Sequence, residues 1–212
     1  MINCYAFRSV PPFAQGLVRD LRVRWALEEA GIPYRVTLVG DQDGAMPRSD
    51  YRYVQPFGQI PAIEDGDLRL FESGAIVLYI AQQSEALLAE DTSARAHAFQ
   101  WMFAALNTIE PAVMRLAEID LFHPTEAWAM ERRPAAVQMM RTRLAELASC
   151  LNGDYLVGTF SVADILMTTV LRILRHTDLL DEQPKLVEYK QRCEARPAFK
   201  KALADQMAAF AA

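Results

Sequence analysis

The sequence predicts a small α/β domain followed by an all-helical domain. Three observations lead to this prediction. Short strand-like runs alternate with helical patterns up to about residue 85, nearly all later segments have helical spacing, and a polar stretch separates the two parts. The 212 residues are enough for two small domains with buried cores. We therefore place the domains at residues 1–83 and 92–212, with the polar linker around residues 83–92.

The first domain begins with a strand, a helix and a second strand. Residues 2–7 are rich in strand formers. After a loop with two prolines, apolar residues recur at helical spacing from Leu17 to Leu27, and Gly31 followed by Pro33 is a helix stop signal. Within this helix the basic stretch 19–24 is interrupted by an aspartate, which is typical of a solvated helix face. Residues 34–39 are expected to form the second strand.

A hairpin and a helix complete the first domain. Residues 40–54 are polar and irregular, with room for one short helix. Residues 60–63 and 68–71 are predicted strands around an Asp-Gly turn, a typical β-hairpin. Residues 73–82 are expected to be helical. The order β-α-β-(α)-β-β-α makes a mixed sheet with helices packed on it.

The second domain is predicted to be a bundle of about five helices. Prolines near helix starts support several boundaries, since the first helical N–H has no partner to lose. The expected helices are residues 94–120 (bent near Pro111), 126–151, 161–176, 184–195 and 197–211.

The helix at residue 161 has a capping box. Ser161 can cap the helix through its side chain while the Asp164 carboxylate reaches back to the Ser161 N–H. The residues that follow are apolar nearly all round, which is typical of a helix in the centre of a bundle. We therefore expect Ser161 and Asp164 to be structural.

Composition and charge exclude several classes of function. A net charge of −5 and a pI near 5.3 argue against a nucleic-acid partner, because phosphate binding needs a concentrated basic surface. No apolar run approaches the roughly 20 residues that cross a bilayer, so no membrane partner is expected. The N-terminus does not resemble a signal peptide, and three scattered cysteines favour a reducing compartment, so a cytoplasmic location is expected. Three histidines lie far apart, and we expect no metal site.

Four stretches of the chain carry a family resemblance. Residues 55–66 read Gln-Pro-Phe-Gly-Gln-Ile-Pro-Ala-Ile-Glu-Asp-Gly, and Leu-Phe-Glu-Ser-Gly-Ala-Ile follows at 70–76. Residues 23–34 and 160–164 agree in the same order along nearly the whole chain. Together they resemble the cytosolic glutathione S-transferase superfamily. The resemblance implies an N-terminal thioredoxin-like domain followed by the all-helical glutathione-transferase bundle.

The resemblance also implies where glutathione binds. The Ile60–Pro61 bond should be cis, which exposes the Ile60 backbone to pair with the cysteinyl backbone of glutathione like an added strand. Ser73, at a helix N-terminus, should bind the γ-glutamyl carboxylate, and Glu72 the ammonium. Gln59 should contact the peptide or its glycine end. Taken singly, each has a plainer explanation: an edge-strand proline, a helix cap, a surface carboxylate.

The residue that would hold the thiol as a thiolate departs from the family pattern. Family members place a Tyr, Ser or Cys after the first strand, but here that position falls at about Val18 or Arg19, in a longer loop. Ser9, which supplies a hydroxyl, and Arg19, whose charge would lower the thiol pKa, are the candidate catalytic residues. Backbone N–H groups of residues 14–17 are a third possibility if the helix starts there. No cysteine lies in the loop, which argues against the thiol-exchange branch of the family.

The expected function is that of a homodimeric glutathione transferase that joins the glutathione thiolate to a small hydrophobic electrophile in detoxification. The apolar breadth of the 94–120 helix fits dimerisation. Phe13, Trp101, Met102 and Phe103 are candidates for an electrophile pocket, although for any one of them a core or interface position is the preferred interpretation. Two alternatives stay open: a non-catalytic binding or scaffold protein of the same fold, and a glutathione-dependent isomerase or dehalogenase.

Overall fold

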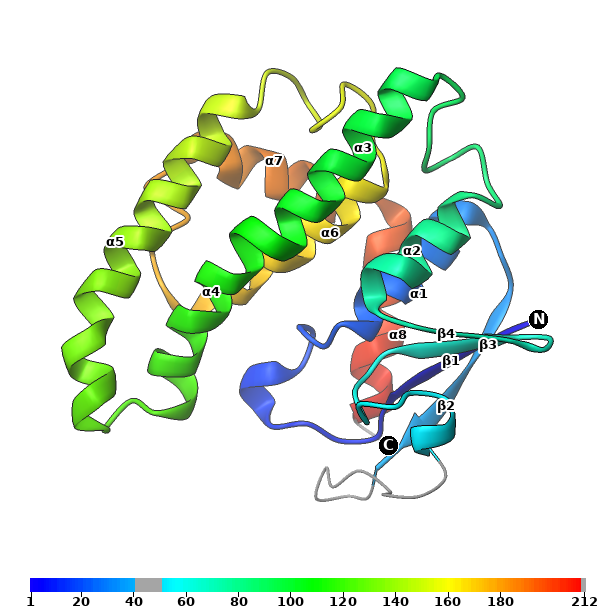
Figure 1. The fold of residues 1–212 in the computed structure, drawn as a ribbon, viewed down its shortest axis with the longest axis horizontal. Helices are drawn as coiled ribbons and strands as arrows, with labels where there is room; N and C mark the ends of the chain where they lie inside the picture. The colour runs from blue at the N-terminus through cyan, green and yellow to red at the C-terminus, as the bar shows by residue number, and fades with distance from the viewer. Residues whose placement is uncertain (41–50, 211–212) are drawn as a thin grey trace. The chain divides into compact units, whose positions relative to one another are not determined.

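The computed structural model describes residues 1–40 and 51–210 (Figure 1). The chain divides into two compact units, one of residues 1–89 with 196–212 and the other of residues 90–195. A small mixed sheet with helices lies in the first unit, and the second is helical, which confirms the predicted fold class. The expected domain 92–212 differs from this division at its end, because the last helix packs within the first unit.

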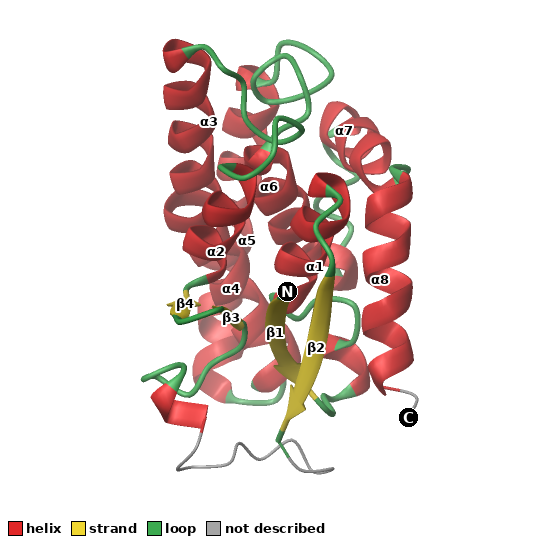
Figure 2. Ribbon diagram, turned by 90° about the vertical axis from the view of Figure 1, so that its right-hand side faces the viewer, coloured by secondary structure: helices red, strands yellow, loops and turns green. Residues whose placement is uncertain are grey.

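The first unit holds a four-stranded sheet in the order β2-β1-β3-β4. β1 and β2 are parallel and lie side by side in Figure 2, while β3 pairs antiparallel with both β1 and β4. The parallel pair needs a crossover, which α1 supplies. Contacts join α1 to β1, and α2 to α1, β3 and β4. The elements are β1 (Ile2–Phe7), α1 (Asp20–Ala30), β2 (Tyr34–Val39), β3 (Ala62–Asp65), β4 (Leu68–Phe71) and α2 (Ser73–Ala81).

Three boundaries of the first unit differ from the sequence prediction. The helix expected from about Leu17 begins at Asp20, after a 3₁₀ turn at Pro12–Ala14 and a left-handed Gly16. The strand expected at 60–63 begins two residues later, after the Ile60–Pro61 bond. Of the short helix expected in 40–54, a 3₁₀ turn at Tyr51–Tyr53 is present, and residues 41–50 lie outside the described part.

The last helix, α8 (Pro197–Phe210), packs on α1. Trp25 and Phe199 meet edge to face with their ring centroids 4.8 Å apart. Arg196 donates two hydrogen bonds to the Glu29 carboxylate, at 2.6 and 2.7 Å. An aromatic contact and a bidentate ion pair therefore attach the C-terminal helix to the first unit.

The second unit is a bundle in which α6 is the most deeply buried helix. The segment predicted as one helix over 94–120 contains two π-helical turns, at Ala105–Ile109 and Glu118–Phe122, and Pro111 lies just after the first of them. In the described part of the chain, no helix is long and apolar enough to cross a membrane. The helices are α3 (Thr92–Ala104), α4 (Glu110–Ala117), α5 (Ala127–Cys150), α6 (Val162–Arg172) and α7 (Pro184–Glu194).

The capping box of α6 is present and is more extensive than the sequence suggests. The Ser161 Oγ accepts from the Ala163 N–H at 3.3 Å, and the Asp164 carboxylate accepts from the Ser161 N–H at 2.9 Å. The same carboxylate also accepts from the Leu156 N–H at 3.0 Å and the Tyr189 hydroxyl at 2.9 Å. Asp164 therefore ties the start of α6 to the preceding loop and to α7.

Candidate functional site

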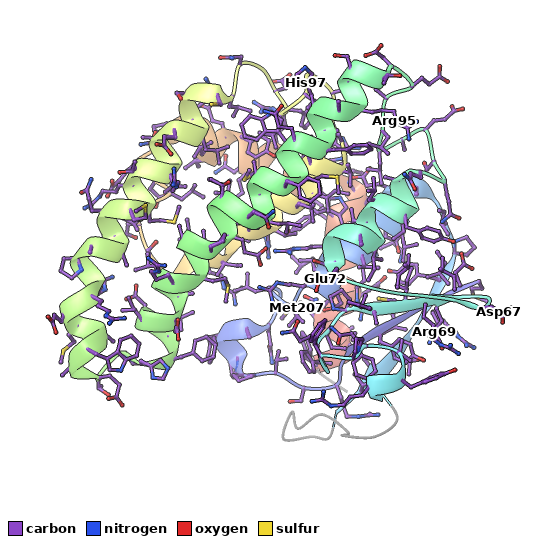
Figure 3. All side chains as sticks on the ribbon, in the orientation of Figure 1. Asp67, Arg69, Glu72, Arg95, His97 and Met207 are labelled. Carbon is purple, nitrogen blue, oxygen red and sulfur yellow. The ribbon has the colours of Figure 1, made fainter. Side chains whose placement is uncertain are left out.

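The β3–β4 hairpin brings the two halves of the expected site together. Ala62 pairs with Phe71 in the antiparallel ladder, so the residues just before Ala62 and just after Phe71 are neighbours. These are Pro61 and Glu72. Figure 3 shows Glu72 at the end of the hairpin that lies opposite Asp67 in the turn. A segment preceding a strand and the start of a helix thus meet at one end of the sheet.

The first half of the site is the segment before β3. The Ile60–Pro61 bond is cis, as the resemblance implies. The ladder pairs that β3 makes with β1 and β4 begin at Ala62, so they leave the backbone of Ile60 for other partners. An extended peptide can use such a backbone as the next strand of a sheet.

Two side chains that the sequence did not single out organise the loop leading to this segment. The Tyr51 hydroxyl donates to the Gln59 carbonyl at 2.7 Å. Gln55 is buried, and its side-chain oxygen accepts from the Phe57 N–H at 2.6 Å. Gly58, at φ 68°, donates its N–H to the Gln55 carbonyl at 3.0 Å. These bonds hold the Gln59 backbone, while its side chain is exposed to solvent.

The second half of the site is the N-terminus of α2. Ser73 is the first helical residue and is buried, whereas Glu72 before it is exposed. Glu72 has φ 69°, a left-handed conformation that costs a residue with a side chain about 1–3 kcal/mol. The first turn of a helix presents N–H groups that have no partner within the helix, together with the positive end of the helix dipole. Such an end is suited to bind a carboxylate.

Arg22 of α1 reaches the Ser73 side chain. Its Nη1 donates to the Ser73 Oγ at 3.0 Å, and Arg22 is only 2% exposed. The basic stretch 19–24 is therefore not the solvated face that the sequence suggested: Asp20 and Arg24 are also buried and pair at 2.7 Å. Their opposite charges four residues apart were the available signal for that pair. No local signal marked Arg22, because its partner lies in another helix.

The candidate thiol-activating residues lie on the loop between β1 and α1. Ser9 is half-buried near the start of this loop, and Arg19 is exposed at its end, just before α1. The third possibility, backbone donors in residues 14–17, is wrong in its premise, because α1 begins at Asp20. The N–H groups of Ala14, Gln15 and Leu17 already donate to the carbonyls of Pro11, Pro12 and Ala14 at 2.8, 3.3 and 3.0 Å.

The residues considered for an electrophile pocket have different environments. Met102 is buried in the core of the second unit, and Trp101 beside it is half-buried. Phe103 is 65% exposed on the same helix, and Phe13 is 37% exposed in the loop after β1. Met102 is thus a core residue, and the two phenylalanines are the accessible members of the set.

Two of the three cysteines, Cys4 and Cys193, are buried. Burial raises the pKa of the Cys4 thiol in β1 far above its usual range, and it raises that of Cys193 to about 12. Thiols with raised pKa values are poor nucleophiles at neutral pH. Cys150 is exposed at the end of α5. Over residues 1–40 and 51–210, no group of three or more His, Cys, Asp and Glu residues could hold a metal ion.

Comparison with known proteins agrees with this geometry. The family model for the glutathione S-transferase N-terminal domain matches residues 15–82, and the model for the C-terminal domain matches residues 120–206. Glutathione S-transferase 4 of Zea mays is 31% identical over 194 residues, 85% of each chain. A disulfide-bond oxidoreductase of Escherichia coli, YfcG, is 30% identical over 187 residues, 84% of this chain and 86% of that one.

Solved structures of glutathione transferases are also similar to this chain. A glutathione transferase family member from Pseudomonas fluorescens, with two glutathione molecules bound, superposes with a TM-score of 0.84 at 26% identity. The match covers 95% of this chain and 92% of that chain. The chain therefore belongs to the cytosolic glutathione S-transferase superfamily of transferases.

Proposed function

We propose that this protein binds glutathione at the end of the β3–β4 hairpin and joins the glutathione thiolate to a small hydrophobic electrophile. The observation that carries the proposal is the juxtaposition of the cis Ile60–Pro61 segment with the N-terminus of α2. The Ile60–Pro61 segment offers backbone groups that can pair with an extended peptide, and the N-terminus of α2 offers N–H donors that can bind a carboxylate. The glutathione bound to the related Pseudomonas fluorescens structure supports this choice of ligand.

Each part of glutathione has a counterpart in the proposed site. The backbone of Ile60 pairs with the cysteinyl residue. Ser73 and the first turn of α2 bind the γ-glutamyl carboxylate, and the exposed Glu72 takes the ammonium. The exposed Gln59 side chain contacts the peptide or its glycine end.

The chemical step needs the thiolate, because the thiol itself is a weak nucleophile. A hydrogen bond donated by the Ser9 hydroxyl, or the positive charge of Arg19, would stabilise the sulfur anion and lower the thiol pKa. The thiolate then attacks an electrophilic carbon and forms a C–S bond. In a substitution, the bond to the leaving group breaks and its electron pair departs with that group. In an addition to an unsaturated carbonyl, the π pair of the C=C bond moves toward the carbonyl, and the resulting anion takes up a proton from water.

Family membership also supports a proposal for the setting of this reaction. We infer a cytoplasmic homodimer that acts in detoxification. The three scattered cysteines support a reducing compartment. Exposed Phe103, Phe122 and Trp128 in the second unit support an interface or a hydrophobic substrate surface there.

Turnover tests this proposal. Purified protein would be incubated with glutathione and a panel of an activated aryl chloride, an alkyl halide and an unsaturated carbonyl, and the adduct would be measured by mass spectrometry. We expect conjugation of at least one, with a lower rate in Ser9→Ala or Arg19→Met, beside the surface controls Ser93→Ala and Arg132→Met. Binding without any turnover would instead favour a scaffold protein. Products that retain no glutathione would favour an isomerase or dehalogenase.

A second candidate is glutathione-dependent disulfide reduction, which the Escherichia coli relative favours. The lack of a loop cysteine does not exclude it, because bound glutathione can be the attacking thiol. The thiolate would attack a disulfide to form a mixed disulfide and release one thiol. A second glutathione would then release the other thiol and leave glutathione disulfide. Formation of glutathione disulfide without an adduct would identify this activity.

A further inference from the structure

Arg22 connects the first turn of α1 to the candidate carboxylate site. Its Nη1 donates to the Ser73 Oγ at 3.0 Å, and both residues are buried. We propose that Arg22 is a positioning residue, which orients the Ser73 hydroxyl so that its proton points to the γ-glutamyl carboxylate. This inference rests on the proposed binding of glutathione.

The chemistry of the two side chains sets the direction of the hydrogen bond. A guanidinium has only donors, so the Ser73 oxygen must be the acceptor. A serine hydroxyl carries one proton, and that proton must therefore point away from Arg22. A carboxylate is acceptor-only and needs such a donor. Without Arg22, the Ser73 hydroxyl would be able to turn toward other acceptors, including backbone carbonyls.

The two buried arginines of α1, Arg22 and Arg24, point in different directions and have different partners. Successive helical residues are about 100° apart, so Arg22 and Arg24 point about 200° apart around the axis. Arg24 pairs with Asp20, whose carboxylate also accepts from the Gln206 amide of α8 at 2.6 Å. Arg24 thus serves the packing of α8, while Arg22 faces α2 and the site.

The test compares glutathione with an analogue that lacks only the γ-glutamyl α-carboxylate, γ-aminobutyryl-cysteinyl-glycine. Both would be titrated by calorimetry into the parent, Arg22→Met, Ser73→Ala and the double variant. We expect Arg22→Met to weaken glutathione binding about tenfold, the effect of one charge-assisted contact, and the analogue by less than about twofold. The double variant should be little weaker than Ser73→Ala, because both changes remove the same interaction.

A purely structural role for Arg22 gives a different result. Equal weakening of both ligands, or none of either, would overturn the inference. If Arg22→Met does not fold, as judged by circular dichroism, Arg22→Gln provides the same comparison. Glutamine can still donate an N–H to the Ser73 Oγ but lacks the charge, so glutathione should be weakened selectively and by less than about tenfold. Failure of the parent to bind glutathione would instead refute the proposed function itself.

Discussion

Replacing Asp164 with alanine tests how much the α6 capping network stabilises the fold. The carboxylate is fully buried and accepts from the Leu156 N–H, the Ser161 N–H and hydroxyl, and the Tyr189 hydroxyl, at 2.9–3.1 Å. A buried donor left without an acceptor costs about 1–3 kcal/mol. If two of the four donors stay unpaired after relaxation, the loss is about 2–6 kcal/mol.

The desolvation of the Asp164 carboxylate makes the expected loss of stability smaller. Burial raises the pKa of Asp164 despite its donors, so the folded protein holds the ionised group at some cost that alanine would remove. We therefore expect Asp164→Ala to lower the free energy of unfolding by about 2–4 kcal/mol, a large part of the usual 5–15 kcal/mol.

Urea unfolding followed by circular dichroism measures this loss. Tyr189→Phe removes one donor and keeps the carboxylate, so it should cost about 1 kcal/mol. The control Asp154→Ala changes an aspartate whose side chain is 71% exposed, and should cost less than about 0.5 kcal/mol. A loss below about 1 kcal/mol in Asp164→Ala would refute the energetic role assigned to this network.

Three further changes address other parts of the first unit. Tyr51→Phe removes the bond to the Gln59 carbonyl and should weaken glutathione binding about three- to tenfold, beside a loss of stability of about 1 kcal/mol; unchanged affinity in a titration would contradict this role. Arg196→Met removes the bidentate pair with α1, and urea unfolding should show a loss of about 1 kcal/mol, since Arg196 is partly exposed; no loss would contradict a stabilising role for this pair. The Tyr5 hydroxyl, which donates at 2.7 Å, lowers the pKa of Glu64 below its ordinary value of 4.5. Because the folded pKa is the lower one, Glu64 adds stability above the unfolded pKa, and this is lost as pH falls through the folded pKa. Urea midpoints from about pH 6 to about pH 3 should therefore fall less steeply in Tyr5→Phe than in the parent, and equal slopes would contradict the assignment.

Much of the site could be predicted because its signals are local. The Asp-Gly turn fixes the hairpin, and the hairpin register places the segment before β3 beside the start of α2. Ser73 at the start of a helix could likewise be placed from sequence. The cis state of Ile60–Pro61 came from family resemblance, since an isolated X-Pro bond prefers trans.

The remaining features depend on partners that are distant in sequence. Arg22 in an alternating charged stretch looks like a surface residue until α2 is packed against it. Whether Asp20 and Arg24 are buried likewise depends on α8, about 180 residues later. The placement of α8 with the first unit has the same cause, because Arg196 and Glu29 meet only in the folded chain. Helical periodicity predicts that a helix has an apolar face that will be buried, but it does not predict which element will cover that face.

Titration of the protein with glutathione by calorimetry, beside Ser73→Ala, tests the central claim most directly. The account predicts saturable binding by the parent and affinity at least about tenfold weaker in Ser73→Ala, which is about 1.4 kcal/mol. The matched control Ser93→Ala, an exposed serine of the second unit, should bind like the parent. No binding by the parent at millimolar glutathione, or equal affinity in the parent and Ser73→Ala, would contradict the account.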